Sequence, residues 1–184
     1  MRFSNKRTGI EARLDRVEAG VLSSMAADLL ELLGSSREGE DEVEVDPLVT
    51  LVGIATEPVE RPVDPALARL LPDAYRDDDQ AAGDFRRYTE ADLRAGKRAD
   101  ATAVLASLAP CADGGRIPLD RELAAAWLGC LNDLRLVLGA RLEVTEETEL
   151  DADPDDPQTQ ALYVYGWLGF VQESLLAGLN RSPR

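Results

Sequence analysis

The chain has no histidine, only two cysteines and few aromatic residues. The lack of histidine removes the commonest general base, the usual zinc ligand and any histidine-containing catalytic triad. The two cysteines, Cys111 and Cys130, lie too far apart for a C-x-x-C motif, and no G-x-G-x-x-G or Walker A pattern occurs. We therefore expect a protein that is not an enzyme and that needs no metal and no cofactor.

Long hydrophobic runs are also missing. No apolar stretch approaches the roughly 20 residues that span a bilayer. The first residues, MRFSNKRTGIEARL, contain basic side chains but not the apolar core of a secretory signal. We therefore expect a cytoplasmic protein.

Positive charge is scarce, and the formal net charge of the 184 residues is −15 at pH 7. Because autonomous nucleic-acid binders usually carry the opposite sign, we expect contact with DNA only through a protein partner. Basic side chains gather at residues 2–16 and 86–98, whereas residues 38–60 and 142–180 contain none. The charge of an individual face therefore matters more than the total.

Helix signals dominate the rest of the chain. Asp15 and Glu18 form a capping box before an apolar stripe that Gly34 ends, which predicts a helix near 16–33. An Asp-Pro pair precedes each of two short predicted helices, 48–55 and 66–71. Capping residues further along the chain predict helices near 80–88, 90–108, 121–142 and 158–178, with Thr89 separating the first two of these.

The predicted fold is all-α, a bundle of five or more helices in a single domain, 1–184, with mobile acidic loops near 35–46 and 143–157. At the N-terminus, Ile10, Ala12 and Leu14 alternate with polar residues. This pattern fits either a short β-hairpin or an irregular end. The stretch 110–118, with two glycines, is expected to be a loop.

The acidic run at 151–156 resembles a calcium loop only superficially. An EF-hand that started at Asp151 would need glycine at the sixth position and glutamate at the twelfth, which here are Asp156 and Leu162. We therefore interpret the run as a solvated linker and expect no metal site.

A basic cluster with one aromatic residue is the candidate partner-binding site. If it is functional, it would contact an acidic protein surface or phosphates. The alternative is that its cations form salt bridges with neighbouring acidic residues of the same chain. Its members are Arg86, Arg87, Tyr88, Arg94, Lys97 and Arg98.

The two cysteines are the candidate redox residues. Cys130 lies between Trp127 and Leu134 on a predicted core face, which favours a buried, unreactive thiol. Cys111 follows Pro110 in the glycine-containing loop, where we expect it to be accessible and oxidisable. Oxidation would either join the two cysteines in a disulfide or leave two unlinked thiols.

Four long segments resemble an actinobacterial family of unknown function that includes an oxidative-stress regulator. They are DPALARLLPDAYRDD, DFRRYTEADLRAGKRADA, WLGCLNDLRLVLGARL and YGWLGFVQESLL. The resemblance implies a helical, non-enzymatic regulator that responds to oxidation and binds a sigma factor or RNA polymerase. The alternative is a non-catalytic adaptor or structural module of another cytosolic complex, such as proteolysis machinery.

Overall fold

The computed structural model describes residues 1–6, 9–34, 59–75, 77–148, 153 and 155–180, and helices account for most of them. The elements follow one another as β1 (Arg2–Lys6), β2 (Gly9–Leu14), α1 (Arg16–Gly34), α3 (Pro65–Leu70), α4 (Asp79–Leu108), a short 3-10 turn (Ala109–Cys111), β3 (Gly115–Leu119), α5 (Arg121–Arg141) and α6 (Pro157–Leu179). The predicted mostly helical fold is confirmed, and of the two alternatives for the N-terminus the β-hairpin is the one that forms.

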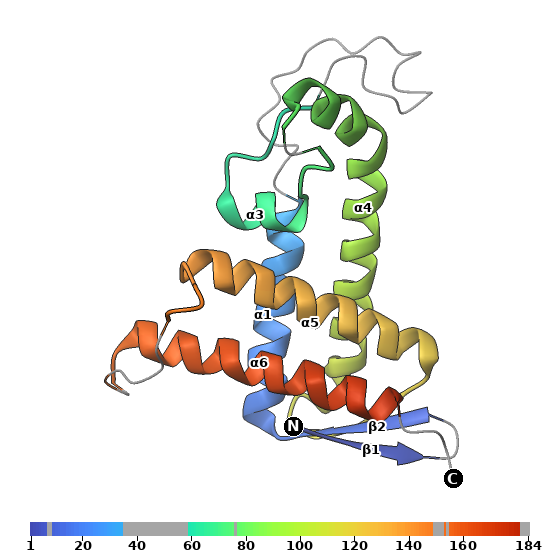
Figure 1. Ribbon diagram of the computed structural model, residues 1–184. Coiled ribbons are helices and arrows are strands. Elements are labelled where there is room, and N and C mark those ends of the chain that lie inside the picture. Colours follow the sequence, from blue (N-terminus) through green and yellow to red (C-terminus); the bar gives the residue numbers. More distant parts are fainter. Residues whose placement is uncertain (7–8, 35–58, 76, 149–152, 154, 181–184) are drawn as a thin grey trace.

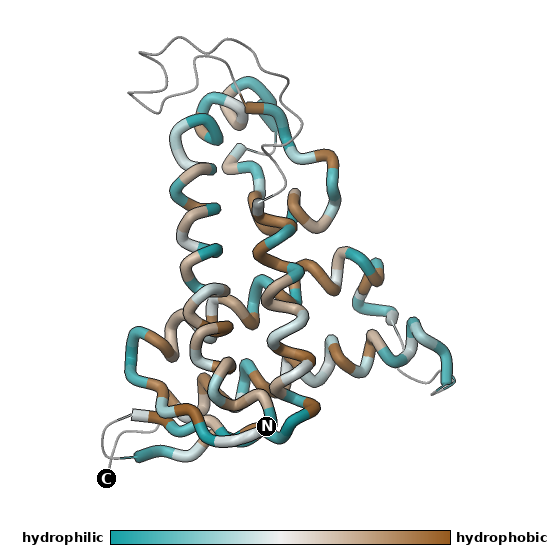
Figure 2. The backbone as a smooth tube through the Cα atoms, turned by 180° about the vertical axis from the view of Figure 1, so that it is seen from behind, coloured by the Kyte–Doolittle hydropathy of each residue, from teal (hydrophilic) through white to brown (hydrophobic). Residues whose placement is uncertain are grey.

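The helices form two crossed pairs above a small sheet (Figure 1). Helices α1 and α4 run side by side along the long direction of the molecule, and α5 and α6 pack together across them. The first turns of α4 extend beyond α5, near α3. Seen from behind, the apolar stretches of the helices concentrate where the two pairs cross (Figure 2).

The sheet is antiparallel, with strand order β1-β2-β3. Phe3 lies opposite Ala12, which lies opposite Ile117, and this row faces the helices. One residue along each strand lies the adjacent row, which consists of Arg2, Arg13 and Arg116. These side chains are on the opposite face of the sheet and are exposed. The alternation follows from the two-residue period of a strand with one buried face.

Strand β3 corrects the prediction of a loop over 110–118. Its five residues include Gly115 and Pro118, both of which are uncommon in strands. The strand lies at an edge of the sheet, where a proline needs no partner for its missing N–H. Pairing with β2 and burial of Ile117 and Leu119 outweigh the weak local propensity.

Most predicted helix starts are confirmed by hydrogen bonds. The Asp15 carboxylate accepts from the Glu18 backbone N–H at 2.9 Å, and the Glu18 carboxylate accepts from the Asp15 N–H at 2.9 Å. These two bonds make a capping box. Asp64 and Asp120 cap α3 and α5 by accepting hydrogen bonds from backbone N–H groups of the first turn.

The predicted break at Thr89 is wrong, because one continuous helix runs from Asp79 to Leu108. The Thr89 hydroxyl donates to the Phe85 carbonyl one turn earlier, at 2.9 Å, and does not cap a new helix. A helix can accommodate threonine in its interior when the hydroxyl makes this bond to the carbonyl of the preceding turn. The true N-cap is Asp78, whose side chain accepts from the Ala81 N–H.

Two other predictions, the loop at 35–46 and the helix at 48–55, lie outside the described residues. The acidic connector near 143–157 is described only in part. Within it, the Thr148 N–H donates to the Thr145 carbonyl in a turn.

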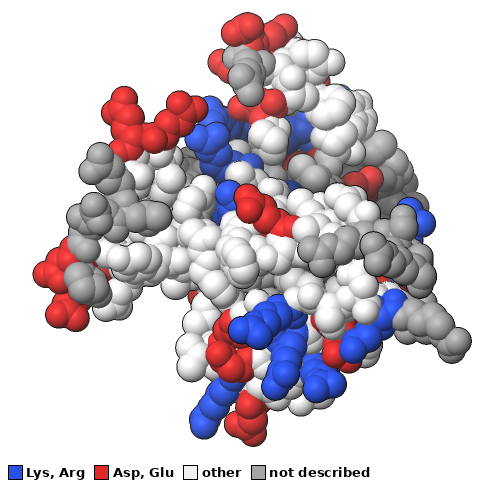
Figure 3. Space-filling model, turned by 60° about the horizontal axis from the view of Figure 1, so that its bottom comes forward, with Lys and Arg blue, Asp and Glu red and all other residues white. Residues whose placement is uncertain are grey.

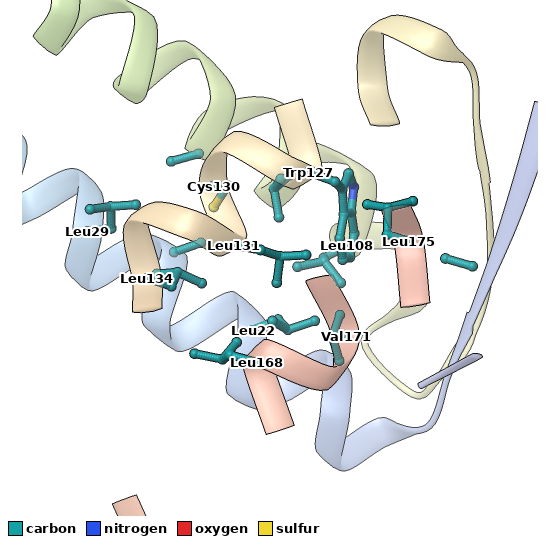
Figure 4. Close-up of a cluster of buried hydrophobic side chains, with 14 of the residues drawn as sticks. Leu22, Leu29, Leu108, Trp127, Cys130, Leu131, Leu134, Leu168, Val171 and Leu175 are labelled. Carbon is teal, nitrogen blue, oxygen red and sulfur yellow. The ribbon is translucent and has the colours of Figure 1, made fainter. Parts of the chain in front are cut away.

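The core forms where the four long helices meet (Figure 4). Trp127 on α5 is fully buried, and its indole N–H donates to the Ser107 hydroxyl of α4 at 3.1 Å. Leu22 from α1 and Leu168 and Val171 from α6 pack in the same cluster. A buried tryptophan needs such a partner for its N–H.

Among the described residues, α5 is the one helix that is long and apolar enough to cross a membrane by length and composition. Its buried side chains belong to the core, since Trp127, Leu131 and Leu134 pack against the neighbouring helices. The same test is passed by the central helix of a globular fold, so it is weak evidence for a membrane span.

Gly9, at the start of β2, should not tolerate a side chain. Its φ is +148°, and an added Cβ would lie 2.5 Å from the Leu119 carbonyl oxygen. We expect Gly9→Ala to lower the free energy of unfolding by about 2 kcal/mol, measured by urea denaturation. Gly96→Ala is the matched control, because nothing lies within 4 Å of an added Cβ there and alanine favours a helix by about 0.5–1 kcal/mol. A Gly9→Ala protein as stable as the parent would contradict this account.

Candidate functional site

Cys130 lies on the inner face of α5, is 1 % exposed and belongs to the same cluster as Leu29 and Leu131 (Figure 4). Burial, together with the nearby negative charges of Asp133 and Asp100, raises the pKa of this thiol to about 12. The thiolate is the nucleophilic form of cysteine. The predicted buried, unreactive thiol therefore matches the structure.

A charged pair lies one turn from Cys130. Asp133 is 2 % exposed, and the Lys97 ammonium of α4 donates to its carboxylate at 2.7 Å. Asp100 borders the same groove between α4 and α5, and its pKa is raised by burial and by the charge of Asp133, with Lys97 opposing. The sequence analysis missed both acids, because neither has a motif and only the packing of α4 on α5 joins them.

Cys111 is buried, with 7 % of its surface exposed, which corrects the expectation of an accessible thiol. It ends the short turn after α4, and its Sγ approaches the Arg116 carbonyl at 3.7 Å. An added Cβ on Gly115 would lie 2.9 Å from this sulfur. The expected loop is instead a tight turn and a strand, and it folds over the thiol.

Both cysteines are free thiols in this structure. A disulfide between Cys111 and Cys130 remains a hypothesis. Because both side chains are buried, an oxidant would first need local opening around the turn after α4 or around α5.

Four of the five cations of the predicted basic cluster pair within the chain. Arg86 is 6 % exposed, and its guanidinium contacts the Asp73 and Glu90 carboxylates and the Leu71 carbonyl. Arg94 also pairs with Glu90, at 2.5 Å. Lys97 pairs with Asp133, as described above. The salt-bridge alternative therefore accounts for these three side chains and for Arg87, which pairs with Asp84.

Arg94 and Arg98 also complete the end of another helix. Arg94 donates to the Leu33 carbonyl at 3.0 Å, and Arg98 donates to the Leu30 carbonyl at 2.9 Å. The last carbonyls of a helix lack partners within it and carry partial negative charge. No basic residue occupies the last turn of α1 itself, so α4 supplies these donors.

Tyr88 and Arg98 are the exposed members of the cluster, and Arg87 is half-buried. The Arg87 guanidinium lies 4.6 Å from the centre of the Tyr88 ring, and Tyr88 is 58 % exposed. Arg87 also pairs with Asp84 at 3.8 Å. Exposed apolar side chains lie nearby in sequence on the same helix, at Phe85 and Leu93.

Phe85 makes an edge-to-face contact with Tyr75, with ring centres 6.1 Å apart. Tyr75 is also exposed, at 52 %. We call Tyr75, Phe85, Tyr88 and Leu93, together with Arg87, the aromatic tip of α4. The sequence analysis identified Arg87 and Tyr88 but missed Tyr75, Phe85 and Leu93, because their exposure depends on how the chain that follows α3 lies against α4.

The described residues contain no group of three or more acidic or cysteine side chains placed to hold a metal ion. The fold and these sites define a mostly helical protein with two buried thiols and an exposed aromatic tip on its longest helix. The chain belongs to the family described as Domain of unknown function (DUF2017), which it matches over residues 1–179.

The curated relatives share one description. The chain is 35 % identical over 180 residues to the oxidative stress regulator AosR of Mycobacterium tuberculosis strain H37Rv, covering 90 % of this chain and 79 % of that protein. The identity and both coverages are the same for the oxidative stress regulator AosR of Mycobacterium bovis. No solved structure matches this chain. The family resemblance found in the sequence is thereby confirmed.

The burial of Cys130 can be tested by alkylation. A rise in the thiol pKa from 9.0 to about 12 lowers the thiolate fraction at pH 8 by about a thousandfold. We expect iodoacetamide to modify Cys130 in the native protein far more slowly than in urea, measured by mass spectrometry. The experiment uses a Cys111→Ser background, so that one thiol is followed. Equal rates with and without urea would contradict the buried position.

The Lys97–Asp133 pair should stabilise the packing of α4 on α5. Lys97→Met leaves the Asp133 carboxylate buried without its cation, and we expect a loss of about 2 kcal/mol in unfolding free energy. The double variant Lys97→Met with Asp133→Leu removes both charges and should recover most of that loss. Urea denaturation of both variants at pH 7 tests this, and a double variant less stable than the single one would refute it.

Proposed function

We propose that this protein is a cytoplasmic, non-catalytic regulator of the response to oxidative stress that acts by binding a sigma factor or RNA polymerase. The observation that carries the proposal is its 35 % identity, over 90 % of its length, to proteins named oxidative stress regulator AosR. The absence of histidine from the sequence fits a role without acid–base catalysis.

The aromatic tip of α4 is the partner-binding surface in this proposal. Exposed aromatic and arginine side chains are enriched where protein interfaces gain most of their binding energy. Tyr88 and Phe85 are 58 % and 46 % exposed, and Arg87 stacks on the Tyr88 ring. Arg86 holds α4 to Asp73, and Arg94 and Arg98 hold it to the end of α1, so these contacts fix the position of the surface.

Oxidation enters the proposal through the two buried thiols. If Cys111 and Cys130 react, the turn after α4 must leave its place over Cys111, or α5 must move from the core around Cys130. Either change alters the elements that position α4. The oxidised protein would then present the aromatic tip differently to its partner.

The proposal is tested by direct binding to purified host sigma factors and RNA polymerase core, with and without peroxide. We expect Arg87→Gln with Tyr88→Ala to weaken binding by about tenfold or more, because it removes an exposed aromatic and its stacked cation. Biolayer interferometry gives the dissociation constants. The matched control is Arg69→Gln with Tyr163→Ala, which removes the same residue types from exposed positions on α3 and α6.

The control variant should bind within about twofold of the parent. Absence of binding to every sigma factor and to the polymerase, in both redox states, would refute the proposal. Direct binding to a subunit of the proteolysis machinery instead would favour the second class of function, an adaptor.

A further inference from the structure

The outer face of the sheet carries a row of arginines that the functions above leave unused. Arg2 lies directly opposite Arg13 in β1 and β2, and Arg13 lies directly opposite Arg116 in β2 and β3. All three are exposed. We call these three residues the arginine row. Figure 3 shows basic side chains gathered over this end of the molecule, with acidic ones between them.

Like charges directly opposite one another destabilise a sheet. The chain has 35 acidic residues and 20 basic ones. Its composition therefore does not account for three cations in one row. Glu11 is the acidic residue of the three strands, and it pairs with Lys6 at 3.5 Å and with Arg116 at 3.9 Å. No ion pair of Arg2 or Arg13 is found among the residues that the structure describes.

Protection of the sheet edges does not account for this row. Charged side chains on edge strands prevent unwanted pairing between sheets. Arg13, however, lies on β2, the central strand. The outward position needs a polar side chain but not a third cation beside two others.

We propose that the outer face of the sheet is a docking surface for an acidic protein segment, recognised by Arg2, Arg13 and Arg116. Neighbouring strands lie about 4.8 Å apart, so the row presents three guanidinium groups across roughly 10 Å. A guanidinium binds a carboxylate through two parallel hydrogen bonds. A short segment rich in Asp and Glu, laid across the strands, would place its carboxylates along this row.

The charge of the rest of the molecule favours a short protein segment over duplex DNA. The protein has a net charge of −15, and the arginine row is confined to the three strands of one small sheet. A duplex carries one negative charge per about 1.7 Å and would meet acidic surface beyond the row. A segment of a few acidic residues can contact the row alone.

This docking surface extends the proposed function by describing the chemistry of one contact with a partner protein. It rests on the proposed function only for the identity of that partner. It is distinct from the aromatic tip of α4. The sheet packs against α5 and α6 at the opposite end of the crossed helices (Figure 1). The two surfaces can therefore be tested separately.

The probe is a fluorescein-labelled peptide of alternating Glu and Ser, about ten residues long and so able to cross three strands. Fluorescence anisotropy measures its binding to the full chain. We expect saturable binding that weakens with added NaCl, as charge pairing requires. Arg13→Gln with Arg116→Gln should weaken it by about tenfold or more. The matched control is Arg61→Gln with Arg69→Gln, which removes two positive charges from exposed sites on and before α3.

Comparable losses in the two double variants would overturn the proposal, because net charge alone would then explain the binding. Tighter binding of a duplex DNA probe of about 20 base pairs at the same salt would also overturn it. Amide chemical-shift mapping of the unmodified protein gives a second readout that no variant can disturb. Shifts confined to β1, β2 and β3 would support the docking surface, and shifts elsewhere would refute it. Neither readout involves a sigma factor or the polymerase, so failure of one proposal is distinguishable from failure of the other.

Discussion

The packing of α5 against every other long helix is the constraint on which the structure depends. It contacts α1, α3, α4, α6 and β3, and Trp127 fills the centre of these contacts. A helix that is surrounded in this way must be apolar on most of its surface. These contacts account for the buried part of the apolar surface of α5, which is about a third of its apolar window (33 %). Asp133, the buried charged side chain of α5, is accordingly paired with Lys97.

The chain has few basic residues, and those on α4 and those on the sheet have different roles. Along α4, Arg86, Arg94 and Lys97 neutralise buried or half-buried acids, and Arg94 and Arg98 complete the end of α1. These contacts hold the helices together, and such residues cannot be assigned to a partner from sequence clustering. On the sheet, Arg2 and Arg13 form no ion pair with another residue that the structure describes. The two groups of basic residues look alike in the sequence, but in the structure one pairs with groups of the same chain and the other lies exposed on the sheet.

The sequence predicted those elements whose signals are local. The capping box of Asp15 and Glu18, the N-cap of Asp120 and the alternation of β2 depend on neighbouring residues, so each could be found without a structure. Two predictions were wrong where the local structure depends on contacts with residues outside the local pattern. Thr89 resembles a helix start but bonds within a continuous helix, and residues 115–119 become a strand only by pairing with β2. That strand and the turn before it bury Cys111, so the error in the site followed from the error in the fold.

The position of Cys130 on the central helix limits how any oxidation of this protein could work. Fast peroxide sensors use exposed thiolates of low pKa, whereas this thiol is buried and its pKa is about 12. Reaction at Cys130 would therefore wait for an opening of the core, and its rate would follow the stability of the packing between α4 and α5. Asp133 and Lys97 lie beside the thiol and belong to that packing. A response of this kind would register sustained oxidative damage to the fold, and not a brief rise in oxidant.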